Sequence, residues 1–164
     1  MDEHKPILRL PDEGRIVSLG AAGDVSLKVE RRDSDGALSA YEFTVPPGMA
    51  GPPLHIHQTW DEFFYVLEGE MTFHLAGNVR LAPAGSCVFV PHGCAHTFWN
   101  AGTTPARQLT IFTPSGIEDY FDAVSSTLVQ GGEESLEGAI ELMRQHDMIV
   151  PEGDGPAYGS LSGR

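Results

Sequence analysis

The sequence predicts an all-β domain, a small barrel or a double-sheet jelly roll, followed by one or two helices. Short alternating segments follow one another for about 90 residues without helical periodicity, and Gly, Pro or Asn bounds each of them. The composition, with 19 Gly and 12 Pro in 164 residues, suits strands and turns better than a helical bundle. Helical spacing begins only after Pro114. The length favours one domain with modest extensions.

The barrel is expected over residues 24–114, after an N-terminal arm. Residues 1–23 hold Pro6, Pro11 and a GAAG turn, which leave room for possible short strands only. Strand patterns then follow in order: VSLKVE, ALSAYEFTV, LHIHQ, EFFYVLEGE, MTFHLAG, NVRLAPAG, SCVFVP, HTFWNAG and ARQLTIFTP.

A helical extension is expected over residues 115–150. Its first segment, SGIEDYFDAVSSTLV, places apolar residues at helical spacing, and EESLEGAIELMRQH repeats the pattern. Two helices of this size form no core alone, so we expect them to pack on the outside of the barrel or against a second subunit. Residues 151–164 have little to bury and are expected to form a flexible tail.

The charge and the cysteine content limit the partners and the compartment. The net charge is −13, and ten acidic residues face a single basic one between Glu118 and Asp154. This balance argues against nucleic acid and against an anionic membrane as partners. No apolar leader or membrane-length segment is present, so we expect a cytoplasmic protein. Cys87 and Cys94 are interpreted as buried small apolar side chains.

Two histidines on one strand point to chemistry. His55 and His57 lie two residues apart and therefore share a face of the predicted strand LHIHQ. Burying two imidazoles together is costly unless hydrogen-bond partners or a metal ion compensate. Glu62 follows beyond a turn and would open the next strand with its side chain directed inward. We favour it over Asp61, which this phase directs outward.

A third imidazole completes a candidate metal site. In the segment GSCVFVPHGCAHTFWN, a tight turn leads into a strand that begins near His96 and shares a face with Phe98 and Asn100. Three imidazoles and one carboxylate suit Fe, Mn, Co, Ni, Cu or Zn, and leave a position for water or substrate.

At these residues the sequence resembles the cupins, compact jelly-roll barrels with two signature motifs. His55, His57, Glu62 and Gly69 match G-x5-H-x-H-x(3,4)-E-x6-G except at its first glycine, because Gly48 lies one residue too far upstream and Gly51 too near. The second motif, G-x5-P-x-G-x2-H-x3-N, matches completely at Gly85, Pro91, Gly93, His96 and Asn100.

The resemblance implies a double-stranded β-helix whose metal ligands are His55, His57, Glu62 and His96. It also implies pairing into homodimers through the N-terminal strand region. Small cupins with HxH-x4-E and a C-terminal helix include relatives of flavonol (quercetin-type) dioxygenases, and GIEDYFDAVSS looks like the start of that helix.

A substrate pocket is expected among apolar side chains near the metal. The candidates are Phe64, Val66, Phe98, Trp60 and Phe112, each of which also fits simple core packing. His92 is interpreted as a turn residue, and the orientation of His74 depends on a register that the sequence leaves open.

Three functions are compatible with these residues. The favoured one is a dioxygenase-type oxidoreductase that couples dioxygen to a small aromatic or enolisable substrate, with Glu62 accepting the proton released on binding. With a redox-silent ion such as zinc, the site would instead suit an isomerase or cyclase. A non-catalytic binding module is the third possibility, although no helix-turn-helix or basic patch suggests a DNA-binding regulator.

Overall fold

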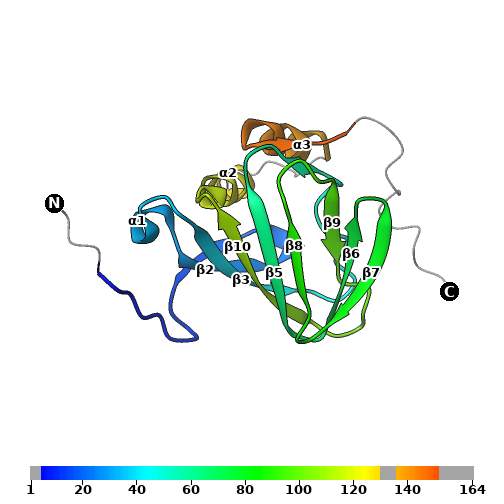
Figure 1. Ribbon diagram of the computed structural model, residues 1–164, viewed down its shortest axis with the longest axis horizontal. Coiled ribbons are helices and arrows are strands. Elements are labelled where there is room, and N and C mark those ends of the chain that lie inside the picture. Colours follow the sequence, from blue (N-terminus) through cyan, green and yellow to red (C-terminus); the bar gives the residue numbers. More distant parts are fainter. Residues whose placement is uncertain (1–4, 130–135, 152–164) are drawn as a thin grey trace.

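Two antiparallel sheets face each other and form the barrel (Figure 1). The computed structural model describes residues 5–129 and 136–151. The larger sheet has the strand order β1-β2-β3-β10-β5-β8 and the smaller one β7-β6-β9. Their bounds are β1 Arg15–Ser18, β2 Asp24–Val29, β3 Ser39–Val45, β5 Asp61–Glu68, β6 Glu70–Leu75, β7 Asn78–Pro83, β8 Cys87–Val90, β9 His96–Trp99 and β10 Ala106–Thr113. The predicted all-β jelly roll is confirmed.

The short elements complete the chain. A 3-10 turn, η1 (Gly20–Ala22), follows β1, and a single helical turn, α1 (Arg31–Ser34), occupies the loop after β2. Strand β4 (Ile56–His57) pairs with β11 (Met148–Ile149) outside the two large sheets. Residues 152–164 of the expected tail lie outside the described residues.

Alternation along the strands fills the barrel. In β5, β10 and β3, every second side chain is buried, including Phe64 and Phe112. Met71 and Phe73 of β6 are also among the largest fully buried side chains. Removing such side chains from water is the main favourable term in folding a domain of this size. The interior of the barrel is therefore filled by a hydrophobic core of buried side chains.

Cys87 differs from its prediction, because it is exposed. It lies on β8, one of the two edge strands of the larger sheet, opposite Tyr65. Val88 and Val90 take the inward positions of this strand, and Phe89 points outward with Cys87 and is 60% exposed. Cys94 is half-buried against the core.

Helices α2 (Ile117–Val129) and α3 (Leu136–Gln145) cover one end of the barrel (Figure 1). Their apolar faces turn toward the barrel, and Ile117, Phe121, Val124 and Met143 are buried. The expected outside packing thus takes a specific form, a cap over the barrel mouth. Neither these nor any other described helix is long and apolar enough to cross a membrane.

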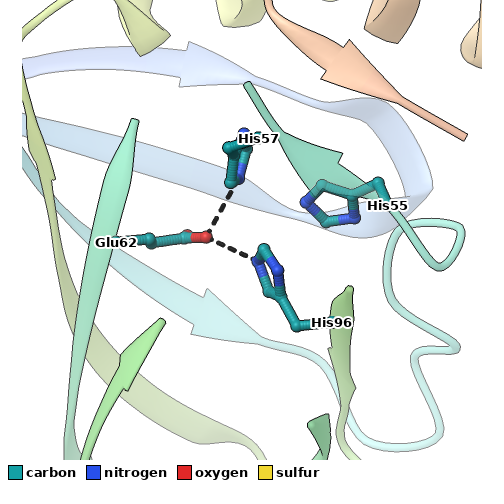
Figure 2. A group of neighbouring side chains, drawn as sticks. All are labelled: His55, His57, Glu62 and His96. Carbon is teal, nitrogen blue, oxygen red and sulfur yellow. Dashed lines mark hydrogen bonds and ion pairs between the residues drawn. The ribbon is translucent and has the colours of Figure 1, made fainter. Parts of the chain in front are cut away.

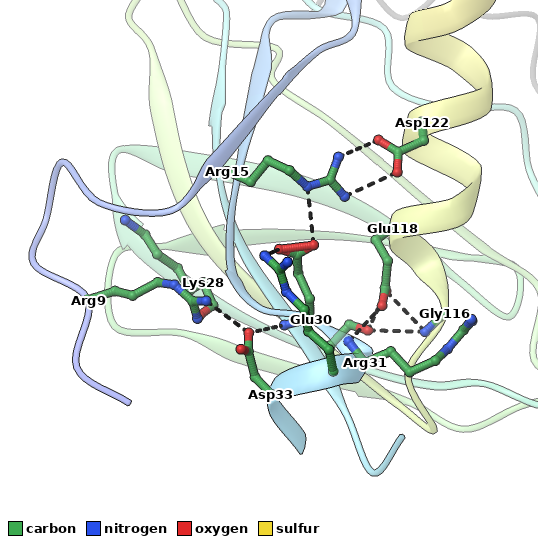
Figure 3. A network of polar contacts seen from close by, with 11 residues as sticks. Arg9, Arg15, Lys28, Glu30, Arg31, Asp33, Gly116, Glu118 and Asp122 are labelled. Atoms are coloured by element: carbon green, nitrogen blue, oxygen red, sulfur yellow. Dashed lines mark hydrogen bonds and ion pairs between the residues drawn. The ribbon is translucent and has the colours of Figure 1, made fainter. Parts of the chain in front are cut away.

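Charged residues fix α2 in place (Figure 3). Arg15 on β1 donates hydrogen bonds to both carboxylate oxygens of Asp122 on α2, and its Nε donates to Glu30 over 3.1 Å. Glu118, only 5% exposed, accepts hydrogen bonds from the Arg31 and Gly116 amides over 2.8 and 3.1 Å and from the Ser39 hydroxyl. Helix α2 is thereby joined to β1, α1 and β3.

Glu118→Gln is expected to weaken the fold by about 1–2 kcal/mol at neutral pH, because hydrogen bonds to a charged acceptor are stronger than those to an amide. Burial alone would raise the pKa of Glu118, but its hydrogen bonds outweigh burial and lower the pKa below the ordinary 4.5. A lowered pKa stabilises the fold above the ordinary value and loses that effect as pH falls through the folded value. Urea unfolding should therefore show the difference between wild type and Glu118→Gln shrinking below pH 4.5; a constant difference would contradict this role.

Candidate metal centre

Three strand residues and His55, which directly precedes β4, meet at the covered end of the barrel (Figure 2). His57 ends β4, Glu62 lies on β5, and His96 begins β9. His55 pairs directly with His96: each backbone amide donates to the other's carbonyl, over 3.1 and 2.9 Å. The backbone thus joins two of the candidate ligands independently of any metal.

The ligand atoms of these four residues all lie within 4.8 Å of one another. His57 Nε2 and His96 Nε2 approach the same carboxylate oxygen, Glu62 Oε2, at 3.1 and 2.8 Å. The side chains are 0–4% exposed. A first-row ion about 2.1 Å from each ligand needs ligand separations of about 3–4.2 Å, so a small contraction would close the set around an ion. The donor set and its geometry both fit a metal site.

The turn between His57 and Glu62 separates inward from outward side chains. Trp60 is buried, and its ring centroid lies 5.5 Å from that of His57. Asp61 points outward as predicted and accepts hydrogen bonds from the His92 amide and ring, over 2.8 and 2.7 Å. His92 therefore belongs to the neighbouring turn and lies outside the ligand cluster.

Backbone carbonyls orient two of the three imidazoles. His55 Nδ1–H donates to the Pro53 carbonyl over 2.7 Å, and His96 Nδ1–H donates to the Cys94 carbonyl over 3.2 Å. Each bond places the proton on Nδ1 and leaves Nε2 to face the cluster, the arrangement that metal-binding histidines use. His57 Nδ1 is buried and has no hydrogen-bond partner among the described residues.

The electrostatics of the cluster favour a cation. Burial alone would raise the pKa of Glu62, but hydrogen bonds from His57 and His96 outweigh it and lower the pKa to about 2. Burial, followed by the neighbouring imidazoles, lowers the pKa of His55 to about 3. Burial also acts to lower the pKa of His96, but its bond to Glu62 raises the pKa above the ordinary 6.5. The Glu62 carboxylate is therefore ionised although it is buried, and the hydrogen bonds from His57 and His96 stabilise its negative charge, as a bound cation would.

The cluster opens into a cavity of about 370 Å³. Part of the wall comes from the barrel and the loop before β4, including Tyr41, Phe43, Met49, Phe98 and Phe112. The other part comes from the C-terminal elements, including Ile117, Tyr120, Phe121, Val124, Met143 and Met148. Glu62 is the only carboxylate, and no Lys or Arg belongs to this wall over the described ranges.

The pocket residues expected from the sequence divide into two groups. Phe98 and Phe112 line the cavity. Phe64 and Val66 do not, because they point into the barrel below the site and are fully buried in the core. Trp60 also lies outside the cavity wall; its ring packs behind those of His57 and Phe112, at 5.5 Å from each.

Sequence reasoning missed the contribution of the C-terminal helices to the cavity. Their apolar positions were recognisable from helical spacing, but that spacing does not show which surface a helix covers. His74, whose orientation the sequence left open, is half-buried on β6 opposite Thr97, outside the ligand cluster.

Comparisons with known proteins agree with this fold. The family described as "Cupin domain" matches residues 41–112. KdgF from Halomonas sp. superposes with a TM-score of 0.61 at 16% identity, over 70% of this chain and 99% of that chain. A RmlC-like cupin from Shewanella frigidimarina gives a TM-score of 0.59 at 19% identity, over 70% and 96% of the two chains.

One curated relative is similar in sequence. It is a "Probable oxidoreductase virH" of Hypocrea virens, 33% identical over 84 residues, which is 48% of this chain. The match spans only 37% of that relative's length. The second signature motif, the facing antiparallel sheets and the matched family model lead to the same assignment: residues 41–112 form a cupin domain.

Proposed function

We propose that this cupin is a metal-dependent oxidoreductase of the dioxygenase type, acting on a small, uncharged aromatic or enolisable substrate. The observation that carries the proposal is a buried three-histidine, one-carboxylate cluster that opens into an apolar cavity. The similarity to a probable oxidoreductase supports the reaction class. Flavonols and related phenols are the substrates to test first.

The cavity wall supports the proposed substrate class. Its volume of about 370 Å³ lies within the range of small-molecule sites. Substrate carboxylates are usually bound by Arg or Lys, and the described wall contains neither. A sugar would bury many hydroxyl groups against Phe98, Phe112 and Met143 without hydrogen-bond partners. Each such group would weaken the binding free energy. An aromatic ring would instead remove apolar surface from water.

Each residue would have a defined task in the reaction. His55, His57 and His96 would hold the ion through Nε2, and Glu62 would complete the set. A redox-active ion would supply electron transfer between substrate and dioxygen. The Glu62 carboxylate would take up the proton of a substrate hydroxyl, while Phe98 and Phe112 would orient the ring and the C-terminal helices would exclude water.

Oxygen uptake by the metal-loaded protein tests this proposal. We expect consumption of dioxygen with quercetin or a related phenol, and none with oxalate or a uronic acid. Iron, manganese, nickel, cobalt or copper should each be loaded separately, because the donor set does not select among them. Oxygen uptake with oxalate but with none of the phenols would contradict the proposed substrate class. So would the absence of uptake with every compound and every metal tested.

A matched methionine pair tests whether the cavity binds the substrate. Met143 lines the cavity and Met71 lies in the core below it, and both are almost fully buried. We expect Met143→Ala to change KM for the phenol at least about threefold, equivalent to about 0.7 kcal/mol of binding. Met71→Ala should lower stability by about 2–5 kcal/mol and leave KM unchanged. Equal KM values for the two variants would place the substrate elsewhere.

The same donor set also accepts zinc, and this observation supports a second candidate function. A zinc-loaded protein would polarise a substrate carbonyl and move a proton through Glu62, which is isomerase or cyclase chemistry. Activity under nitrogen with zinc, and none with the redox-active metals in air, would favour this alternative.

A further inference from the structure

The turn between His57 and Glu62 is held by a residue far away in the sequence. Asp147 accepts hydrogen bonds from three successive backbone amides of that turn. Its carbonyl accepts from Gln58 over 3.0 Å, and its Oδ2 accepts from Thr59 and Trp60 over 3.0 and 3.3 Å.

Asp147 is itself rigidly placed. It follows helix α3 with φ +66, a left-handed conformation that Asp adopts more readily than most residues. The next residues form β11, in which Met148 pairs with His57 and Ile149 with Ile56. Met148 is 3% exposed and lines the cavity. Backbone pairing therefore fixes Asp147 beside the turn that it binds.

His57 has fewer side-chain anchors than the other two imidazoles. Backbone carbonyls of Pro53 and Cys94 orient His55 and His96, whereas His57 Nδ1 has no hydrogen-bond partner in the described ranges. Apart from the contact of its Nε2 with Glu62, the position of His57 depends on its backbone and on ring packing against Trp60 and Phe112. The turn that Asp147 holds carries Trp60 and fixes the separation between His57 and Glu62.

We propose that Asp147 is a positioning residue of the metal centre, whose carboxylate fixes the turn between His57 and Glu62 and so holds these two ligands at chelating distance. The inference rests on the metal site proposed above. It assigns a role to a residue beyond residues 41–112, the part that matches the family. The C-terminal extension would then contribute to metal affinity as well as to the cavity wall.

Substitution of Asp147 by glycine tests the role of its carboxylate separately from that of its backbone. Asp147→Gly keeps the left-handed backbone at no steric cost and removes only the Oδ2 acceptor. Asp35→Gly is the matched control, because Asp35 has φ +53, follows α1, is exposed and lies outside the ligand cluster. Asp147→Asn retains an amide oxygen that can accept from the same two amides, so it serves as the rescue variant.

Titration of the metal-free proteins with Co²⁺ provides the readout, with the visible absorption of the bound ion reporting its geometry. We expect Asp147→Gly to bind Co²⁺ about 10–100-fold more weakly with an altered absorption band, the range observed for outer-shell partners of metal ligands. Asp35→Gly should match wild type, and Asp147→Asn should recover most of the affinity. If Asp147→Gly only destabilised the fold, its thermal midpoint would fall, but the folded molecules would bind Co²⁺ with the absorption band of wild type.

The outcomes separate this inference from the proposed function. Wild-type affinity and an unchanged band in Asp147→Gly would overturn the role of Asp147 alone. A failure of oxygen uptake by a protein that binds Co²⁺ normally would overturn the oxidoreductase proposal alone. A wild-type protein that binds no Co²⁺ would overturn both.

Discussion

His57→Ala is expected to lose more than about 100-fold in metal affinity, beyond the range caused by changes in outer-shell partners. His57 Nε2 lies 3.1 Å from Glu62 Oε2, and a first-row ion between the four side chains would lose one of its donors. The fold should persist, because the substitution also removes a buried imidazole with an unpartnered nitrogen. Metal content after gel filtration, together with circular dichroism, measures both effects.

His92→Ala is the control for this prediction, since His92 bonds to the outward-facing Asp61 and should leave the metal content unchanged. His74→Ala should behave in the same way. Loss of metal from His92→Ala combined with retention in His57→Ala would refute the ligand assignment.

Gly51→Ala is expected to destabilise the fold by about 3 kcal/mol or more, the second large effect. A Cβ at residue 51 would lie 1.6 Å from the Phe98 carbonyl oxygen, so the loop before β4 would have to move away from β9. The backbone at Gly51 has φ +77, which adds about 1–2 kcal/mol for a non-glycine residue. The displaced loop includes Pro53, whose carbonyl orients His55, so metal affinity should fall as well.

Gly48→Ala separates the conformational cost of a positive φ from the steric clash of the added Cβ. Gly48 has φ +72, but its added Cβ would meet no atom of the described residues within 4 Å. Only the conformational cost of about 1–2 kcal/mol is therefore expected. Guanidinium unfolding of the two variants gives the comparison, and equal losses would show that the close approach at Gly51 is unimportant.

The clustering of His55, His57, Glu62 and His96 was predictable from the sequence, because strand alternation and the two cupin motifs together identify these residues. Alternation along a strand placed His55 and His57 on one face, and the turn before Glu62 reversed the direction of the chain. The phase of β5 also placed Asp61 outside. The helices were recognisable from their apolar spacing, and the barrel was recognisable from the regular series of short strands.

The cavity and the role of Asp147 depend on long-range contacts that spacing does not encode. The bonds from Asp147 to Thr59 and Trp60 cross 88 and 87 residues, and the two-residue pairing of β11 with β4 is too short to leave an alternating pattern. Cys87 was misjudged because the run CVFV does not show which of its alternate side chains face the core, and the structure directs Val88 and Val90 inward. Whether the chain pairs through its N-terminal strand region stays a prediction.

The most direct test of the metal centre is elemental analysis by plasma mass spectrometry of untagged protein, purified without chelators or added metal. We predict about one transition-metal ion per chain, matching the single cluster of His55, His57, Glu62 and His96 in the described structure. A protein that contains no metal, and still binds none after reconstitution with each candidate ion, would contradict the account.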